Sequence, residues 1–124
     1  MVKILVVDDS SLARRSTRKI LETAGYEVLE AENGLSGLEL YYLEKPAVVV
    51  LDVTMKDMDG IEVLKRIRDL DETAKVVIAT ADVQSSTRQM AEDGGACGFV
   101  NKPVLAKSLL DAIYGCLEQG AACN

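Results

Sequence analysis

Three acidic residues follow two runs of aliphatic residues, and their types and positions could support metal-dependent phosphoryl transfer. Asp8 and Asp9 end the apolar run 4–7, and Asp52 ends the apolar run 48–51. Apolar runs of this length without polar alternation are typical of strands buried on both faces of a parallel sheet. Because ligands of such sheets bind at the carboxyl ends of the strands, we expect the three acids to share one rim.

Carboxylates gathered at one rim would repel one another, and a bound cation would relieve that repulsion. Carboxylates with a backbone carbonyl and water supply the oxygen ligands that Mg²⁺ prefers. The alternative is that Asp8 and Asp9 only cap the following helix, but acids on two separate strand ends make this less favourable. We therefore predict a Mg²⁺ site, with Asp52 as the nucleophile that accepts a phosphoryl group.

Two further strand ends carry groups suited to the same chemistry. Thr80 ends a fourth predicted strand, and Lys102 follows a fifth, directly before Pro103. A lysine ammonium would neutralise charge on the phosphoryl oxygens, and a hydroxyl would orient one of them. Taken singly, a lysine such as Lys102 is most often solvated, and a threonine such as Thr80 is most often an ordinary strand residue. The prediction depends on four strand ends supplying suitable groups together.

The elements that must position these residues alternate regularly between strand and helix. Alternating units with short connections predict a parallel sheet covered on both faces and joined by right-handed crossovers. We expect one domain over residues 1–124, without an internal repeat. The predicted strands are 3–7, 26–31, 47–51, 75–80 and 98–101, and the predicted helices run from about 11 to 24, over 35–43, from 61, over 84–93 and after 103.

The ends of these helices are predicted from capping and turn residues. Asn33-Gly34 is expected to form a turn, and Gly25 and Gly94-Gly95 to end helices. Pro103 suits the first turn of the last helix, and the tail 119–124 is expected to fray. The inward residues of the first helix are expected to be Ala13, Ile20, Leu21 and Ala24, and those of the last Leu105, Leu109, Ile113 and Leu117.

Composition narrows the function classes. A net charge of −6 argues against nucleic acid as a partner, and no apolar run approaches the roughly 20 residues of a membrane span. No signal peptide is recognised at the start. The three cysteines lack zinc spacing, which predicts reduced thiols in a cytoplasmic protein. The chain has no histidine, so imidazole chemistry must come from another molecule.

The combined motifs resemble those of response-regulator receiver domains, and among them the single-domain, CheY-like members. The resemblance covers essentially the whole chain, and the motifs that carry it are highly specific in their combination and order. It implies a flavodoxin-like, doubly wound α/β sandwich of three layers, with a five-stranded parallel sheet in the order 2-1-3-4-5. The matching motifs are Val7-Asp8-Asp9-Ser10, Leu51-Asp52, Met58-Asp59-Gly60, Thr80-Ala81, Gly95-Ala96 and Lys102-Pro103.

The resemblance implies how the site would work. Asp52 would accept the phosphoryl group from a phosphohistidine on a histidine kinase, and Lys102 would contact the phosphoryl oxygens. Asp9, Asp52 and the backbone carbonyl of Thr54 would bind Mg²⁺ directly, with Asp8 acting through water.

The resemblance also implies a switch. Thr80 would move to bond a phosphoryl oxygen, and Phe99 would rotate inward into the space that Thr80 leaves. The surface from about 83 to 114 would then change its binding properties. The Lys102–Pro103 peptide is usually cis in this family.

Several residues depart from the family's usual pattern or stand outside it. Lys56 replaces a common proline after Asp52, and Phe99 replaces a common tyrosine, which removes a switch hydroxyl. Thr54 and Asp82 are expected to tune the lifetime of the phosphoryl group. The basic residues of the first helix are most simply a solvated face, and alternatively a docking patch for an acidic kinase domain: Arg14, Arg15, Arg18 and Lys19.

We predict a stand-alone, non-enzymatic response regulator that binds a protein target after phosphorylation and is reset with or without a phosphatase. Chemotaxis with a flagellar motor target is the leading pathway, and an intermediate in a phosphorelay is the alternative. A haloacid-dehalogenase-type phosphatase would need an aspartate where Thr54 stands. A flavodoxin would not place Asp8-Asp9 against the FMN phosphate. A receiver that works without phosphorylation is disfavoured because the motif set is complete.

Overall fold

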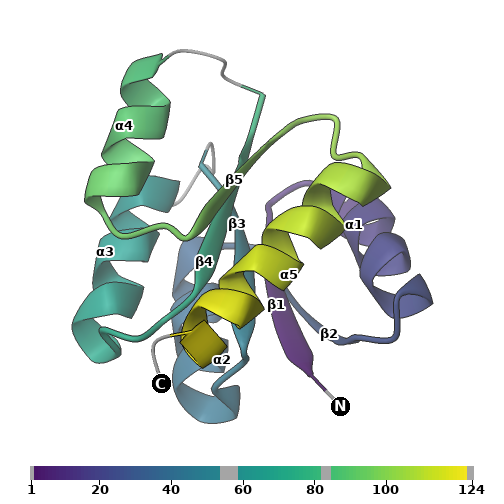
Figure 1. Ribbon diagram of the computed structural model, residues 1–124, viewed down its shortest axis with the longest axis horizontal. Helices are drawn as coiled ribbons and strands as arrows, with labels where there is room; N and C mark the ends of the chain where they lie inside the picture. Colours follow the sequence, from purple (N-terminus) through teal and green to yellow (C-terminus); the bar gives the residue numbers. More distant parts are fainter. Residues whose placement is uncertain (1, 54–58, 82–84, 123–124) are drawn as a thin grey trace.

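Five strands alternate with five helices in the part of the chain that the structure describes (Figure 1). The structure is a computed structural model that describes residues 2–53, 59–81 and 85–122, with side chains described except at 85–87 and 119–122. The strands are β1 (Lys3–Val7), β2 (Glu27–Ala31), β3 (Val48–Asp52), β4 (Val76–Thr80) and β5 (Gly98–Asn101). The helices are α1 (Ser11–Thr23), α2 (Gly34–Glu44), α3 (Gly60–Leu70), α4 (Ser85–Asp93) and α5 (Ala106–Ala122).

The strands form one parallel sheet in the order β2-β1-β3-β4-β5, which confirms the predicted topology. The order reverses between β1 and β3, the point where ligands bind in sheets of this type. Val7 pairs with Leu51 at this point. The residues that follow this pair, Asp8 and Asp52, therefore lie side by side at the end of the sheet.

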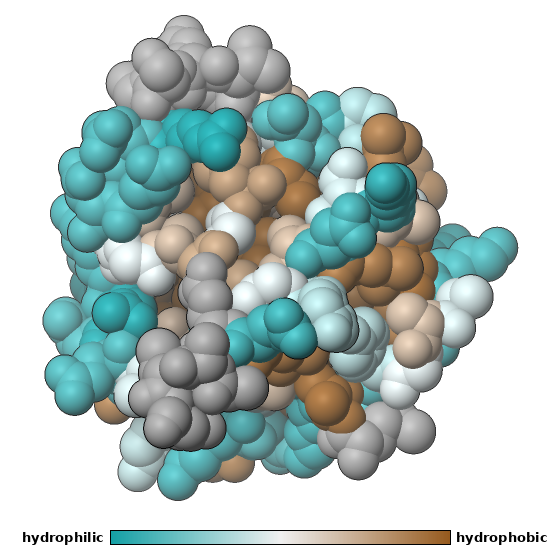
Figure 2. Space-filling view, viewed as in Figure 1, coloured by the Kyte–Doolittle hydropathy of each residue, from teal (hydrophilic) through white to brown (hydrophobic). Residues whose placement is uncertain are grey.

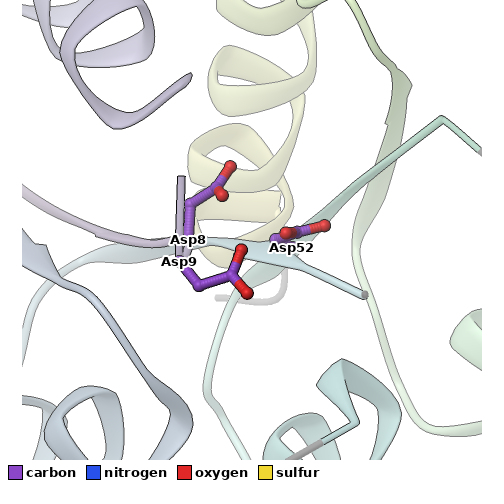
Figure 3. A group of neighbouring side chains, drawn as sticks. All are labelled: Asp8, Asp9 and Asp52. Atoms are coloured by element: carbon purple, nitrogen blue, oxygen red, sulfur yellow. The ribbon is translucent and has the colours of Figure 1, made fainter. Parts of the chain in front are cut away.

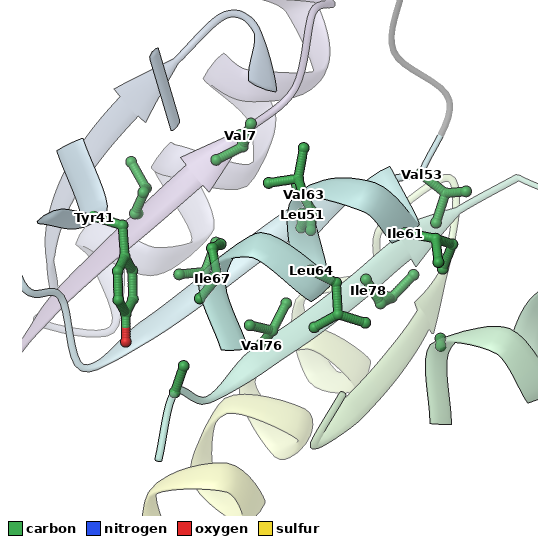
Figure 4. Packing of buried hydrophobic residues seen from close by; sticks show 14 of the residues in the cluster. Val7, Tyr41, Leu51, Val53, Ile61, Val63, Leu64, Ile67, Val76 and Ile78 are labelled. Atoms are coloured by element: carbon green, nitrogen blue, oxygen red, sulfur yellow. The ribbon is translucent and has the colours of Figure 1, made fainter. Parts of the chain in front are cut away.

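Helices cover both faces of the sheet and bury two apolar cores (Figure 1). α2, α3 and α4 pack on one face, where Leu51, Ile67 and Val76 are fully buried (Figure 4). α1 and α5 pack on the other face, against Val6 and Val50. Each fully buried aliphatic side chain contributes about 1.5–3 kcal/mol relative to an exposed one, so these two cores fix the strand ends. No helix of the described residues combines the length and apolar character needed to cross a membrane.

Gly60 lets α3 start directly against the end of β3. A Cβ atom at this position would lie 2.3 Å from the backbone oxygen of Asp52 and 2.5 Å from Cα of Val53. The Gly60 N–H donates to the backbone oxygen of Val53 at 2.9 Å, and the carboxylate of Asp59 accepts from Ile61 N. Only a residue without a side chain fits this approach.

The structure corrects several local predictions about helix ends. Asn33 caps α2 by accepting from Ser36 N, and Gly34 begins the helix, so the two residues are not a separate turn. Ala24 is the exposed C-cap of α1 rather than an inward residue, whereas Thr17 is buried.

The last helix also differs from its prediction. Pro103 lies three residues before α5, not in its first turn, and Leu105 is 64% exposed because it precedes the helix. Leu109 and Ile113 are fully buried as predicted. The helix continues through Ala122, and fraying of the tail 119–124 stays a prediction.

The prediction of reduced thiols is wrong for two of the three cysteines. Cys97 and Cys116 form a disulfide with their Cα atoms 5.7 Å apart. Their separation of 19 residues gave no sign of this, because only the packing of α5 on β5 brings them together. Cys123 lies outside the described residues.

Candidate metal and phosphoryl-transfer site

The three predicted acids converge at the carboxyl end of the sheet (Figure 3). Asp8, Asp9 and Asp52 each offer a carboxylate oxygen, and these oxygens lie within 4.8 Å of one another. Asp8 and Asp52 are buried, at 5% and 3% exposure, while Asp9 is more exposed. The first two acids follow β1 and the third ends β3, so the strand order alone brings them together.

The donor set fits a hard divalent cation. The cluster offers three carboxylate oxygens, the chain has no histidine, and no described cysteine belongs to the cluster. Such a set of ligands favours Mg²⁺ or a similar ion over soft metals. A cation here would relieve the repulsion between acids that burial otherwise strengthens. The described residues thus form a cluster that could bind a metal ion.

Lys102 joins the cluster from the end of β5. Its Nζ lies 2.7 Å from Oδ2 of Asp8 and 3.4 Å from Oδ2 of Asp52. Burial alone would lower the pKa of Lys102, but the hydrogen bond to Asp8 and the charges of Asp52 and Asp8 outweigh it and raise the pKa. The ammonium is therefore charged at neutral pH and bridges two acids that come from different strands.

Asp8 also organises the turn between β1 and α1. Its Oδ1 accepts from Ser10 N at 2.9 Å, and its backbone oxygen accepts from the Arg14 guanidinium at 2.6 Å. The N-cap of α1 is Ser10, whose hydroxyl accepts from Ala13 N. Helix capping thus does not account for the acidic doublet, since the other Asp8 oxygen contacts Lys102.

Thr80 and Lys102 lie next to each other at the same rim. Thr80 is fully buried and ends β4, and the Lys102 N–H donates to its backbone oxygen at 2.8 Å. The register pairs Asp52 with Ala79, which places Thr80 one residue beyond the partner of the phosphoacceptor candidate. The Lys102–Pro103 peptide is cis, as expected from the resemblance.

Phe99 is partly buried against the core that α3 and α4 cover. The guanidinium carbon of Arg88 on α4 lies 5.4 Å from the centroid of its ring, within the range of a cation–π contact. Arg88 also forms an ion pair with Glu92 at 3.4 Å. Sequence reasoning missed Arg88, because nothing in the pattern of α4 distinguishes it from other exposed helix residues.

The structure thus brings together Asp8, Asp9, Asp52, Thr80 and Lys102, and places Phe99 on the strand that leads to Lys102. The remaining predicted site residues, Thr54, Lys56 and Asp82, lie outside the described residues.

Comparison with known proteins agrees with this geometry. The family model for the response regulator receiver domain matches residues 4–114. The chain therefore belongs to the response regulator receiver family, and its fold is the CheY-like, flavodoxin-type sandwich.

Two relatives and one solved structure match this chain over most of their own length. It is 40% identical over 112 residues to the chemotaxis protein CheY of Bacillus subtilis, which covers 90% of this chain and 93% of the relative. It is 36% identical over 111 residues to sporulation initiation phosphotransferase F of the same organism, with 90% of each chain covered. The structure of a CheX–CheY–BeF₃–Mg²⁺ complex from Borrelia burgdorferi matches with a TM-score of 0.87 and 27% identity, over 90% of this chain and 86% of that one.

Proposed function

We propose that residues 1–124 form a single receiver unit that accepts a phosphoryl group on Asp52 in a Mg²⁺-dependent reaction. The observation that carries the proposal is the bridge of Lys102 Nζ between Asp8 and Asp52, at 2.7 and 3.4 Å, within a cluster of three acids. The bridge and the cluster place the Lys102 ammonium and the two acids that follow β1 around the carboxylate of Asp52, which ends β3. The cluster lies at the edge of the sheet where ligands bind in folds of this type.

The proposed reaction moves the phosphoryl group from nitrogen to oxygen. A carboxylate oxygen of Asp52 attacks the phosphorus of a phosphohistidine on a histidine kinase, the N–P bond breaks, and the imidazole leaves and takes up a proton. Lys102 holds a phosphoryl oxygen by its charge, and Thr80 binds a second one through its hydroxyl. Asp9, Asp52 and the Thr54 carbonyl are the proposed Mg²⁺ ligands, with Asp8 acting through water; the ion would neutralise charge on the phosphoryl group.

The new charge would be read by the surface that α4, β5 and α5 present. Phosphorylation adds about −1.5 to −2 charges, which attract Lys102 and Thr80 and bias the packing of β4 and β5. Phe99 lies partly buried on β5 and is the proposed second switch residue. Met90, Leu105 and Tyr114 are half or more exposed, and apolar residues show among polar ones on this side of the molecule (Figure 2). An exposed apolar set of this kind suits a protein target.

The relatives favour a signalling function over the catalytic turnover of a substrate. A CheY relative at 40% identity supports a chemotaxis role, with a flagellar motor switch as the proposed target in the cytoplasm. The relative named sporulation initiation phosphotransferase F supports the second candidate, an intermediate in a phosphorelay. In both cases Thr54 and Asp82 are proposed to tune how long the phosphoryl group survives, with or without a phosphatase.

The first helix supports a docking role for its basic face. Arg14 and Arg18 are paired with Glu30, but Arg15 and Lys19 form no ion pair with any described residue. Leu12, one turn before Arg15, is 75% exposed. Free cations beside an exposed apolar side chain suit an acidic kinase domain. Reversing both free charges should slow transfer from the kinase and leave phosphorylation by a small donor unchanged; equal slowing of both would count against docking.

Asp52→Asn tests the proposed function. The amide cannot form the acyl phosphate, so incubation with Mg²⁺ and a small acyl phosphate should phosphorylate the wild-type chain and leave the variant unlabelled by intact-protein mass spectrometry. Asp111→Asn, an exposed aspartate on α5, is the matched control and should label fully. Undiminished labelling of Asp52→Asn would contradict the assignment. Steady turnover of small phosphoesters would instead support the phosphatase alternative.

A further inference from the structure

We propose that Cys97 and Cys116 form a reversible thiol–disulfide site that opposes the phosphorylation switch when it is oxidised. The inference rests on the proposed function, because the switch is the process that the bond would restrain. It concerns residues that the phosphoryl chemistry does not use. The ligand of the site is a dithiol reductant or, in the reverse direction, a small disulfide.

The bond links the start of β5 to the inner face of α5. The Cys97 N–H donates to the backbone oxygen of Val76 at 2.8 Å, which attaches this cysteine to the sheet just before β5. Cys116 is fully buried in the core under α5. Between them, a Cβ atom added at Gly98 would lie 3.4 Å from Cβ of Ala112 and 3.6 Å from Sγ of Cys116. The helix therefore lies close against the strand where the bond joins them.

The strand that the bond fixes is also the strand that the proposed switch must move. Phe99 lies two residues after Cys97, and Lys102 follows the end of the same strand. Lys102 contacts Asp8 and Asp52 through Nζ and Thr80 through its backbone N–H. A shift of β5 toward a phosphoryl group on Asp52 would thus change the distance between Cys97 and α5.

A disulfide limits such a shift. It tolerates Cα separations of about 4.4–6.8 Å, and the present arrangement, at 5.7 Å, lies within that range. The oxidised form is therefore compatible with the arrangement described here and restricts the alternatives, whereas the reduced form leaves β5 free to move against α5. By linkage, a bond that favours the arrangement in which Lys102 Nζ contacts the carboxylates of Asp8 and Asp52 must weaken binding of a phosphoryl group, or its mimic, that draws Lys102 toward itself.

A dithiol reductant can open the Cys97–Cys116 bond by thiol–disulfide exchange, because it supplies both electrons that the protein disulfide takes up. A reductant thiolate attacks Sγ of Cys97, which is partly exposed, and the S–S bond breaks so that Cys116 leaves as a thiolate and takes up a proton. The second reductant thiol then displaces the Cys97 thiolate from the mixed disulfide, and the reductant departs as its own disulfide. The protein disulfide gains two electrons and two protons. Disulfides of cytoplasmic proteins are usually transient ones of this kind.

The experiment uses the full chain carrying Cys123→Ser, so that no third thiol competes. The protein is treated with oxidised glutathione or with dithiothreitol, and free thiols are alkylated and located by peptide mass spectrometry. The proposal predicts that after oxidation Cys97 and Cys116 are blocked to alkylation and recovered as one cross-linked peptide pair without glutathione adducts, and that both are labelled after reduction. Labelling of both cysteines after oxidation would overturn it.

The functional arm measures binding of beryllofluoride with Mg²⁺, a tetrahedral mimic of an acyl phosphate. The reduced form should bind about fivefold or more tightly than the oxidised form, the low end of couplings between two sites. Cys97→Ser should bind like the reduced form under both treatments; because Cys97 is partly exposed, this variant keeps the buried core intact. Equal affinity of the oxidised and reduced forms would overturn the proposal. Absence of binding in every form would overturn the proposed function itself, while the alkylation result would still report whether the bond forms.

Discussion

At the scale of single residues, the site depends on charges that compensate one another. Lys102 is the one described cation that contacts both Asp8 and Asp52, and its raised pKa keeps it protonated. Removing it would leave two buried carboxylates without their shared partner. We therefore expect that removal of Lys102 impairs phosphoryl binding but does not impair metal binding.

Lys102→Ala should keep Mg²⁺ binding and lose the response to phosphorylation. The three acids remain, and the loss of a nearby positive charge makes the rim more attractive to a cation. Without metal, we expect the free energy of unfolding to fall by about 1–3 kcal/mol, the cost of leaving a buried acceptor unsatisfied. Calorimetric Mg²⁺ titration, denaturant unfolding and target binding after phosphorylation measure the three effects.

Lys65→Ala is the matched control, because this exposed lysine lies on α3, outside the proposed target surface, and forms no ion pair with a described residue. It should behave like the wild-type chain in all three assays. Full target binding by phosphorylated Lys102→Ala would rule out the proposed role of the lysine.

Residue types alone predicted most of the site. Asp8, Asp9, Asp52, Thr80 and Lys102 converge as expected, since each follows or ends a strand and parallel strands share one rim. Contacts between neighbouring elements were not predictable in the same way. The position of Arg88 over Phe99 and the pairing of two cysteines depend on how far each helix is rotated and shifted along the sheet. A single sequence carries no direct signal for the rotation of a helix or for its shift along the sheet.

At the scale of elements, the site depends on how closely α3 approaches β3. A side chain at position 60 would collide with the backbone of Asp52 and Val53, so the first turn of α3 would have to move away from Asp52. The strand ends were predicted well because apolar runs mark buried parallel strands. Helix starts were predicted less well, since Asn33 suits either a turn or an N-cap, and Pro103 suits either the first helical turn or the segment before the helix.

Gly60→Ala should destabilise the fold by about 1–3 kcal/mol, a cost typical of overpacking a filled site. It should also weaken Mg²⁺ binding, because Asp52 shares the displaced backbone. Denaturant unfolding and metal titration give the two quantities.

Gly115→Ala provides a contrasting control. It lies within α5, where an added Cβ meets no atom within 4 Å, and alanine is favoured over glycine in helices by about 0.5–1 kcal/mol. This variant should be slightly more stable than the wild-type chain. Equal stability of the two alanine variants would contradict the close approach at Gly60.

At the scale of the whole molecule, function depends on bringing together parts that are distant in the chain. The alternating strand and helix pattern predicted the parallel sheet covered on both faces, and the resemblance implied its strand order; both were confirmed. That order joins residues 8, 52, 80 and 102 at one rim, while the partner surfaces proposed above lie on α1 and on α4, β5 and α5. Against the net charge of −6, Arg15 and Lys19 on α1 stand out as a local exception, because neither forms an ion pair within the described part of the chain.

Mg²⁺ titration followed by the backbone amide NMR signals tests the central claim most directly, because it reports on all the strand ends at once. Saturable shifts should appear together at the ends of β1 and β3 in the wild-type chain. Asp9→Asn and Asp52→Asn should weaken binding at least about tenfold, as expected for loss of a charged ligand. Unsaturable shifts, or the same affinity in the wild-type chain and both variants, would contradict the account.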